Sequence, residues 1–329
     1  MAATDDIETM AKSMSAHFKT MPQQTPTFEK DFVDFSRGML RLIADPLVND
    51  LGLNGNVTEP VTLLDSACGV GVVTQEVQAA LPDEILQSSS FTCADSSEAM
   101  VDVVKKRIVE EKWVNVEAKV LDAQDTGLPE SSFTHVAIAL GLHIIPDPDA
   151  AVRGKIHRAS ESAIHHGHSL TIKPLLDCMR LLKPGGRFGA STWPKSNANM
   201  FWIPDMREAL QSLPFDAPMP DPLPMQMHKS GHWDDAAWIE GHLKELGLRN
   251  VSVKENLGTC KIENATQFIR CFAMMLPWVM NTFWSEEVRN AHPAEEVREL
   301  MRQYLEKKYK GEGWSIEWLV ITMAGTVEK

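Results

Sequence analysis

Short apolar segments alternate with segments of helical character through the middle of the chain. The four apolar runs are Val61–Asp65, Phe91–Asp95, Val116–Asp122 and His135–Leu140. Val70–Ala80 follows the first run and Ser97–Glu110 follows the second, and both predict helices. Strands that alternate with helices are typical of a parallel, doubly wound sheet with right-handed crossovers.

Three further strands and several helices are predicted in the second half. Residues 181–193 predict a helix end, a Pro-Gly-Gly turn and a fifth strand, and Val251–Glu255 and Trp318–Met323 are expected to finish the sheet. Helical stretches lie around residues 200–212, 234–247, 264–280 and 293–309. The expected fold class is α/β: a doubly wound, mostly parallel, seven-stranded Rossmann-like sheet with N-terminal helices and a helical lid inserted after the fifth strand. We expect this substrate lid around residues 195–245 and 264–312.

The N-terminal region divides into two parts. Residues 1–27 are polar and rich in methionine and predict a flexible tail. Apolar residues then recur at spacings of three and four over Phe28–Leu42, which predicts a helix that ends or kinks at Pro46. Residues 28–329 are expected to form a single domain.

The composition is that of an ordinary globular protein. Of the 329 residues, 43% are apolar, which provides a core and excludes disorder for most of the chain. The longest apolar run, Phe272–Met280, has nine residues with Pro277 inside it, against about 20 needed to cross a bilayer. The first residues include early acids without a basic or apolar segment, so no secretory signal is expected.

The charge and the cysteine content restrict the classes of binding partner and the cellular compartment that we expect. The 32 basic and 45 acidic side chains give a net charge of −13, which disfavours binding to nucleic acid. The five cysteines are scattered and form no C-x-x-C motif, so neither a disulfide framework nor a zinc site is indicated. We therefore expect a cytoplasmic protein that acts on a small molecule. Nothing in the pattern indicates a protein partner or a homodimer.

A glycine-containing loop, Leu63–Gly71, joins the first predicted strand to the following helix. Gly69 and Gly71 let the backbone turn tightly and approach a ligand, because glycine has no Cβ. Asp65 stands at the carboxyl end of the strand, where open α/β sheets bind their ligands. The loop is therefore the first candidate for a ligand site.

Two further acids end predicted strands. Asp95 lies 24 residues after Gly71 (95 − 71), where a carboxylate can accept hydrogen bonds from both ribose hydroxyls. The alternative is a helix cap, in which Asp95 and Glu98 form a capping box. Asp122 could accept a hydrogen bond from an adenine amine, or it could be a solvated turn residue. Together the acids favour a nucleoside ligand.

The dinucleotide-binding fingerprint is the main alternative for this loop. That fingerprint has a third glycine, whereas this chain has Thr74 at the position and an acid, Asp65, before the loop. A carboxylate repels a pyrophosphate and attracts the ammonium group of an amino acid. The loop therefore favours a nucleoside that carries a cationic amino acid over NAD.

Five motifs in sequence order point to a known family. The motifs are Leu64–Gly71, Ala94–Met100, Leu121–Gln124, Leu128–Phe133 and Leu182–Phe188. Over about residues 60–195 the chain resembles a class I S-adenosylmethionine-dependent methyltransferase of the ubiquinone/menaquinone-biosynthesis-like superfamily. The D-x-A-C-G-x-G form of the first motif resembles small-molecule methyltransferases of fungal metabolism.

The resemblance implies that S-adenosylmethionine binds at these motifs. The residues so implied are Asp65, Ala67, Gly69 and Gly71 around the methionine part, Asp95 at the ribose with Ser96 beside it, Asp122 and Ala123 at the adenine, and Leu140, whose carbonyl would bind the ammonium group. Ala67 occupies a position at which many relatives have glycine.

Methyl transfer from a sulfonium is an in-line displacement that mainly needs the acceptor about 3–3.5 Å from the methyl group in a dry pocket. A phenol or carboxylic acid must also lose a proton, and His143, just past the fourth strand, is the candidate base. The alternative for His143 is a packing role. Trp193 and Trp202 are expected to form pocket walls for a flat acceptor, while the other late tryptophans build a core.

One segment departs from the family pattern. Residues 152–174 add 23 residues before the Pro-Gly-Gly turn, which is long for an α/β connection. His165, His166 and His168 lie in it, but without other ligands they favour a solvated loop over a metal site. A translated intron is a second explanation, because removal of the segment restores the expected spacing.

The sequence thus predicts an enzyme that transfers a methyl group to an oxygen, nitrogen or sulfur atom of a small, aromatic metabolite of secondary metabolism. Two alternatives bind the same cofactor without methyl turnover. One is a regulatory protein, and the other is a cyclase that uses the bound sulfonium electrostatically. Release of S-adenosylhomocysteine would separate the enzyme from both.

Overall fold

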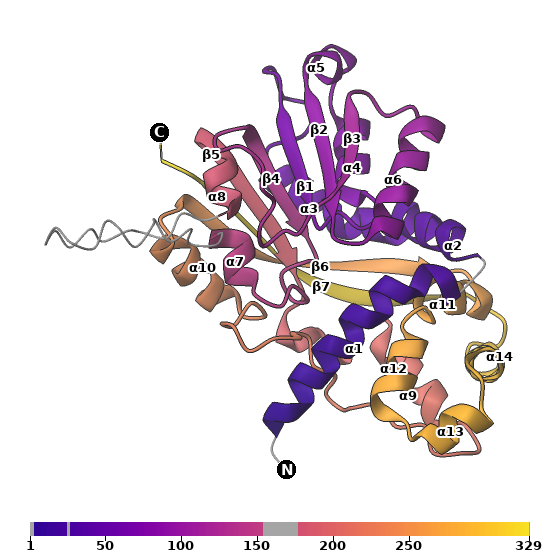
Figure 1. The fold of residues 1–329 in the computed structure, drawn as a ribbon. Coiled ribbons are helices and arrows are strands. Elements are labelled where there is room, and N and C mark those ends of the chain that lie inside the picture. The colour runs from indigo at the N-terminus through magenta and orange to yellow at the C-terminus, as the bar shows by residue number, and fades with distance from the viewer. Residues whose placement is uncertain (1–2, 25–26, 154–176, 329) are drawn as a thin grey trace, which may run out of the picture.

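The computed structural model describes residues 3–24, 27–153 and 177–328, and this part of the chain contains a seven-stranded sheet in the order β3-β2-β1-β4-β5-β7-β6 (Figure 1). The strands are β1 (Thr62–Ser66), β2 (Ser90–Asp95), β3 (Val116–Val120), β4 (Phe133–Ala139), β5 (Leu182–Thr192), β6 (Arg249–Ile262) and β7 (Trp314–Thr326). Strands β1 to β5 pair in parallel, as the alternation of strands and helices predicted.

The last two strands make the sheet mixed rather than mostly parallel. β7 pairs antiparallel with both β5 and β6. The helices between β6 and β7 stand beyond the end of β6, so β7 starts opposite that end, with Trp314 beside Ile262, and runs back along its neighbour. Both strands are also longer than the short apolar runs predicted, because they continue past the sheet into a second layer.

Helices cover both faces of the sheet because successive strand residues point to opposite sides. Leu63 and Phe91 pack on the face that carries α3 (Arg41–Asp50) and α4 (Val72–Ala80), with α6 (Glu98–Glu110) beside β2 and β3. Leu64 packs on the other face, and this core includes residues of α7 (Pro148–Arg153), α8 (Asp177–Leu181) and α10 (Ala236–Glu245). A short helix, α5 (Asp83–Ser88), precedes β2.

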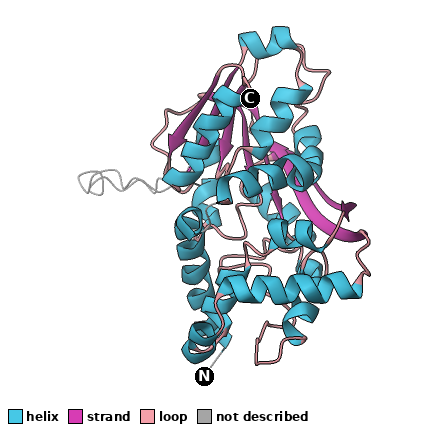
Figure 2. Cartoon of the chain, turned by 90° about the vertical axis from the view of Figure 1, so that its right-hand side faces the viewer, coloured by secondary structure: helices cyan, strands magenta, loops and turns pink. Residues whose placement is uncertain are grey.

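A helical layer with its own core stands beyond the sheet (Figure 2). Its helices are α9 (Ile203–Gln211), α11 (Ala265–Phe272), α12 (Leu276–Phe283), α13 (Glu286–Ala291) and α14 (Ala294–Lys308). Fully buried side chains such as Phe268 and Met301 fill the core of this layer. Ile262 and Ile316, at the far ends of β6 and β7, belong to the same core, so the two long strands join the layers.

The expected flexible tail is wrong for most of its length. Residues Ala3–Gln24 form a helix, α1, which crosses the molecule and contacts α12 (Figure 1). Met10 and Met14 are buried in the helical core. The polar composition concealed a helical spacing of apolar residues, and this narrow stripe is sufficient for packing against another layer.

Pro46 lies inside a helix that continues to Asp50, so the expected helix end at this residue is wrong, while the alternative, a kink, stays a prediction. The chain runs from α2 (Phe28–Phe35) through a π-helical turn (Ser36–Leu40) into α3, which contains Pro46. Proline removes one hydrogen bond from a helix interior. Here the residues that follow it, Leu47 and Val48, are buried against the sheet, and this packing holds the helix to Asp50.

The region expected as a lid also differs in part. Helix α10 packs on β6 and β7 instead of joining the helical layer, because Ile239 and Leu243 are buried in the core of the sheet. Residues 154–176 lie outside the described residues, so the predicted insertion with its three histidines stays a prediction.

The five cysteines carry free thiols. Among the described helices, none combines the length and the apolar character that a membrane span requires.

Candidate functional site

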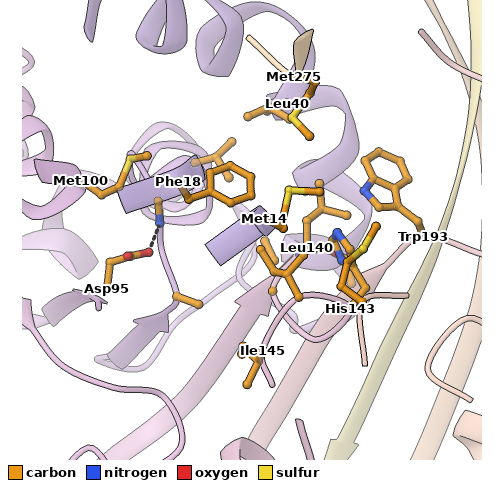
Figure 3. Close-up of a pocket in the computed structure, with 18 of the residues that line it drawn as sticks. Met14, Phe18, Leu40, Asp95, Met100, Leu140, His143, Ile145, Trp193 and Met275 are labelled. Atoms are coloured by element: carbon orange, nitrogen blue, oxygen red, sulfur yellow. Dashed lines mark hydrogen bonds between the residues drawn. The ribbon is translucent and has the colours of Figure 1, made fainter. Parts of the chain in front are cut away.

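A cavity of about 490 Å³ lies between the carboxyl ends of the strands and the helical layer. The loop after β1 and the ends of β2 and β4 line one end, while the helical layer and α1 line the other. Figure 3 shows Asp95 on one side of this cavity, Trp193 and His143 on the other, and Met14 and Phe18 of α1 between them. The two ends differ in chemistry, and each is described in turn.

The loop after β1 takes a left-handed backbone at three positions, with φ of 53° at Ala67, 54° at Gly69 and 83° at Gly71. A Cβ built on Gly69 would meet nothing within 4 Å, so open space lies beside it in the cavity wall. A Cβ on Gly71 would lie 3.1 Å from the Trp113 ring. Gly71 therefore serves packing and does not line the cavity, whereas Ala67 and Gly69 do.

Ala67 is an alanine in a conformation that favours glycine, so Ala67→Gly is expected to stabilise the protein. Relief of the left-handed strain outweighs the greater chain entropy of glycine, and we expect a gain of about 0.5–1 kcal/mol in the free energy of unfolding. Urea denaturation measures it. The control, Ala79→Gly in helix α4, should lose about 1 kcal/mol. A loss in both variants would contradict the strain argument.

Asp95 joins the loop to the next helix. Its Oδ2 accepts a hydrogen bond from the backbone N–H of Gly69 at 2.9 Å, and its Oδ1 accepts one from that of Ser97 at 2.9 Å. Ser97, not Asp95, is the N-cap residue of α6, and its side chain makes no capping bond, so the capping-box alternative is wrong in detail. Burial raises the pKa of Asp95. The carboxylate lines the cavity with lone pairs left for a ligand.

Asp65 lies beneath the loop and not in the cavity wall. Its Oδ2 accepts hydrogen bonds from the backbone N–H of Thr74 at 3.1 Å and from the Thr74 hydroxyl at 2.9 Å. Its Oδ1 has no partner among the described residues. Burial raises the pKa of Asp65 to about 7. Asp65 therefore anchors the start of α4 from behind the loop.

The remaining residues of the predicted cofactor set line the cavity. They are Ser96, Asp122, Ala123 and Leu140. β3 ends at Val120, so Asp122 stands on the following turn, exposed, with its Oδ1 accepting a hydrogen bond from the backbone N–H of Gln124 at 2.9 Å. Leu140 follows β4 with φ of 52°, held by hydrogen bonds from its N–H to the carbonyl and hydroxyl oxygens of Ser191. Left-handed non-glycine residues such as this one cluster at functional sites.

The opposite end of the cavity is apolar and aromatic. Trp193 and Trp202 line it. The ring centroid of Trp193 is 5.4 Å from that of Phe201, which lies 5.1 Å from that of Phe272 in an edge-to-face arrangement. Packed rings of this kind form a rigid wall suited to a flat ligand. Cys271 also lines this end, and burial raises the pKa of its thiol to about 11, so the thiol is uncharged at neutral pH.

His143 lines the cavity beside Leu140, where the sequence placed the candidate base. Burial and the nearby His228 lower the pKa of His143 to about 3, so the ring is neutral at physiological pH. Its Nδ1 has no hydrogen-bond partner among the described residues. The lowered pKa makes the ring a weak base, so it meets a ligand as a neutral hydrogen-bonding group.

Helix α1 forms part of the cavity wall, and this contribution was not predicted from the sequence. Met14 and Phe18 line the cavity, and Trp278 of α12 does so as well. The spacing of Met10, Met14 and Phe18 by four residues was the available signal for a helical face. No comparable signal identifies Trp278, because its position depends on how the helices pack.

The packing of α1 is expected to weaken in acid. Burial lowers the pKa of His17 to about 4, below its ordinary 6.5, so protonation favours the undocked helix. The docked state is fully favoured above pH 6.5 and loses about 2 kcal/mol between pH 7 and pH 5. Hydrogen exchange of α1 at pH 5, compared between the wild type and His17→Leu, measures this. Equal protection of α1 in both proteins would contradict it.

Among the described residues, no three histidine, cysteine or acidic side chains come together as metal ligands. The polar groups that line the cavity include backbone turns, two acids and a neutral histidine. The site therefore consists of a polar end on the sheet and an apolar end on the helical layer.

Comparison with known proteins identifies the family. A family described as a methyltransferase domain matches residues 63–163. The chain is 30% identical over 290 residues to the methyltransferase tpcH of Aspergillus fumigatus, covering 87% of this chain and 92% of that protein. It is 28% identical over 275 residues to the methyltransferase ktnA of Aspergillus niger, covering 83% of this chain and 86% of that one.

A third relative has a more specific description. The chain is 26% identical over 266 residues to the acetylaranotin bis-thiomethyltransferase of Aspergillus terreus, covering 81% of this chain and 82% of that protein. These matches agree with the resemblance found in the sequence motifs. The chain belongs to the S-adenosylmethionine-dependent methyltransferases of class I and resembles fungal members of that family.

Proposed function

We propose that this methyltransferase acts on an oxygen, nitrogen or sulfur atom of a small, aromatic metabolite. The observation that carries the proposal is the acceptor end of the cavity, the part lined by the helical layer and α1. The described residues that line it carry no charged side chain, and its titratable groups, His143 and Cys271, are neutral. An uncharged, aromatic-walled site favours a flat, neutral acceptor, because burial of a charge without a partner is costly.

The polar end suits S-adenosylmethionine. The open space beside Gly69 admits a close ligand, and the acids Asp95 and Asp122 lie in the same wall. We assign Asp95 with Ser96 to the ribose, Asp122 and Ala123 to the adenine, and the loop from Ala67 to Gly69 with the Leu140 carbonyl to the amino-acid part. Asp65 and Gly71 act behind this wall, by anchoring and packing the loop.

When bound, S-adenosylmethionine supplies an electrophilic methyl group on a sulfonium. The side chains of this chain then have three tasks. Trp193 and Trp202 hold the acceptor in line, the apolar wall that includes Met14 excludes water, and His143 accepts a hydrogen bond from the acceptor. Positioning and desolvation provide most of the acceleration for such a displacement.

His143 gives the proposal a direct test. His143→Gln is expected to lower kcat/KM for phenolic acceptors by about tenfold, because the neutral ring orients the acceptor hydroxyl by a hydrogen bond, whereas its lowered pKa makes it a weak base. A thiol that is already ionised at the assay pH needs no base, so its rate should change little. Release of S-adenosylhomocysteine, measured across a panel of phenols, thiols and amines, provides the readout, with calorimetric binding of S-adenosylmethionine as the folding control.

The size of the effect of His143→Gln also indicates which atom of the acceptor receives the methyl group. The similarity to a bis-thiomethyltransferase supports sulfur, whereas a large effect of His143→Gln would support oxygen. Binding of cofactor without release of S-adenosylhomocysteine for any member of the panel would contradict the proposal and favour a regulatory protein or a cyclase.

A further inference from the structure

The loop that follows β4 carries His143 into the cavity wall. Within the loop, the backbone N–H groups of Ile144 and Ile145 both donate to the carbonyl of Gly141 at 3.0 Å, so the chain turns back on itself there. A ring that orients an acceptor must keep its place, since a displacement of about 1 Å can lower a rate by about 100-fold. The groups that hold this loop therefore bear on the reaction.

A segment more than eighty residues later in the chain holds the loop next to His143. The backbone N–H of Met227 donates to the carbonyl of His143 at 2.8 Å, and Nε2 of His228 donates to the carbonyl of Leu142 at 2.8 Å. Any residue at position 227 other than proline could supply the first bond, because it comes from the main chain. The second bond comes from a side chain, so it depends on the identity of His228.

The ring of His228 is committed to this contact. The side chain is buried at 7% exposure, and His228 is not among the residues that line the cavity. Burial lowers the pKa of His228, so the ring is neutral at physiological pH and has a single N–H. A carbonyl can only accept, so that hydrogen is on Nε2 and is used by Leu142.

We infer that His228 is a positioning residue for methyl transfer, which holds the loop at Leu142 so that His143 keeps its ring at the acceptor. The inference rests on the proposed function, because it gives His143 its task. Leu140, at the start of the same loop, is held separately by Ser191, so cofactor binding should not depend on His228.

A double-mutant cycle with 2-naphthol, a flat neutral phenol, as the acceptor tests the inference. His228→Leu removes the donor and is expected to lower kcat/KM by up to about tenfold, as His143→Gln does, with the affinity for S-adenosylmethionine kept. In the His143→Gln background the same change should cost less than about twofold, because the loop then has no ring to place. Release of S-adenosylhomocysteine measures the rates.

Two further variants separate positioning from a general effect on packing. His228→Gln should recover most of the rate, because its Nε2 amide lies the same number of bonds from the backbone and can donate to the same carbonyl. The control is His242→Leu. His242 is also buried, but its Nε2 lies 2.9 Å from Oδ1 of Asp149, so this variant should keep kcat/KM within about twofold of the wild type.

Nuclear magnetic resonance of protein labelled with ¹⁵N-histidine tests the same contact without turnover. In the wild type, saturated with S-adenosylhomocysteine, the ring of His228 is expected to carry its hydrogen on Nε2. The ring signals of His143 should shift in His228→Leu and stay close to the wild-type values in His228→Gln.

The failures are distinguishable. Additive effects of His228→Leu and His143→Gln, or a glutamine variant as slow as the leucine variant, would overturn the inference and leave the proposed function intact. Failure of every acceptor in the panel would overturn the proposed function, and the spectra then show whether His228 places the ring. If His228→Leu does not fold, as judged by cofactor binding, the wild-type spectrum decides, since a hydrogen on Nδ1 of His228 would contradict the contact.

Discussion

Replacement of Asp95 with alanine is expected to weaken binding of S-adenosylmethionine by about 100-fold or more. The change removes an ionised acceptor for the ribose hydroxyls, and each charge-assisted hydrogen bond contributes about 1.5–3 kcal/mol. It also frees the backbone N–H of Gly69, which Asp95 holds at 2.9 Å, so the loop loses its fixed position. Calorimetric titration of the purified protein measures the affinity.

The matched control is Asp102→Ala. Asp102 lies on α6, the helix that follows Asp95, and its side chain is 55% exposed beside Lys105. Removal of the same charge there should leave the affinity within about twofold, because exposed charges are screened. An affinity of folded Asp95→Ala within about tenfold of the wild type would show that ribose binding does not depend on this carboxylate.

The second large effect concerns stability. Arg107, on α6, is 1% exposed, and its guanidinium donates to Glu111 at 2.6 Å, to the backbone carbonyl of Val70 at 2.5 Å and to the side chain of Gln75. It also lies 4.7 Å from the ring centroid of Trp113. Arg107→Met is expected to lower the free energy of unfolding by about 3 kcal/mol, because it leaves buried acceptors unpaired.

Urea denaturation measures this loss, with Arg302→Met as the control. Arg302 pairs with Glu299 on the exposed face of α14, and loss of such a pair costs about 0–1 kcal/mol. Because Arg107 bonds the carbonyl of Val70, next to Gly69, the variant should also bind cofactor more weakly. A loss below about 1 kcal/mol would mean that Trp113 and its neighbours repack around the shorter side chain.

The polar end of the cavity could be predicted from the sequence because its signals are local. A strand end, a glycine turn and an acid lie within a few residues of one another, as in Asp65 to Gly71, and parallel strands bring such ends to one edge. The spacing of these residues does not determine the direction in which each acidic side chain points. Asp65 turns toward Thr74, beneath the loop, while Asp95 faces the cavity, and only the packed structure distinguishes them.

The acceptor end could be predicted only in part because its residues come from distant elements. Trp193 follows β5 directly and Trp202 comes after one short helix, so both are close to the strand end in the sequence. Asn197 is defined by a hydrogen bond with Leu319, more than a hundred residues later, and Met14 by the docking of α1. Such positions depend on tertiary contacts, which the local secondary-structure propensity of a segment does not encode.

The two long strands constrain how the molecule can move. β6 and β7 pair continuously from Val253 beside Met323, in the core of the sheet, to Ile262 beside Trp314, in the helical layer. A pair of strands that runs through both cores resists bending. We therefore expect no hinge motion that separates the sheet from the helical layer. Helix α1 lies outside this pair of strands and forms part of the cavity wall, so we expect ligand exchange to involve its movement. We expect the rate at which the amphipathic helix α1 undocks to limit turnover. A covalent cross-link between α1 and α12 is then expected to prevent the release of a bound ligand.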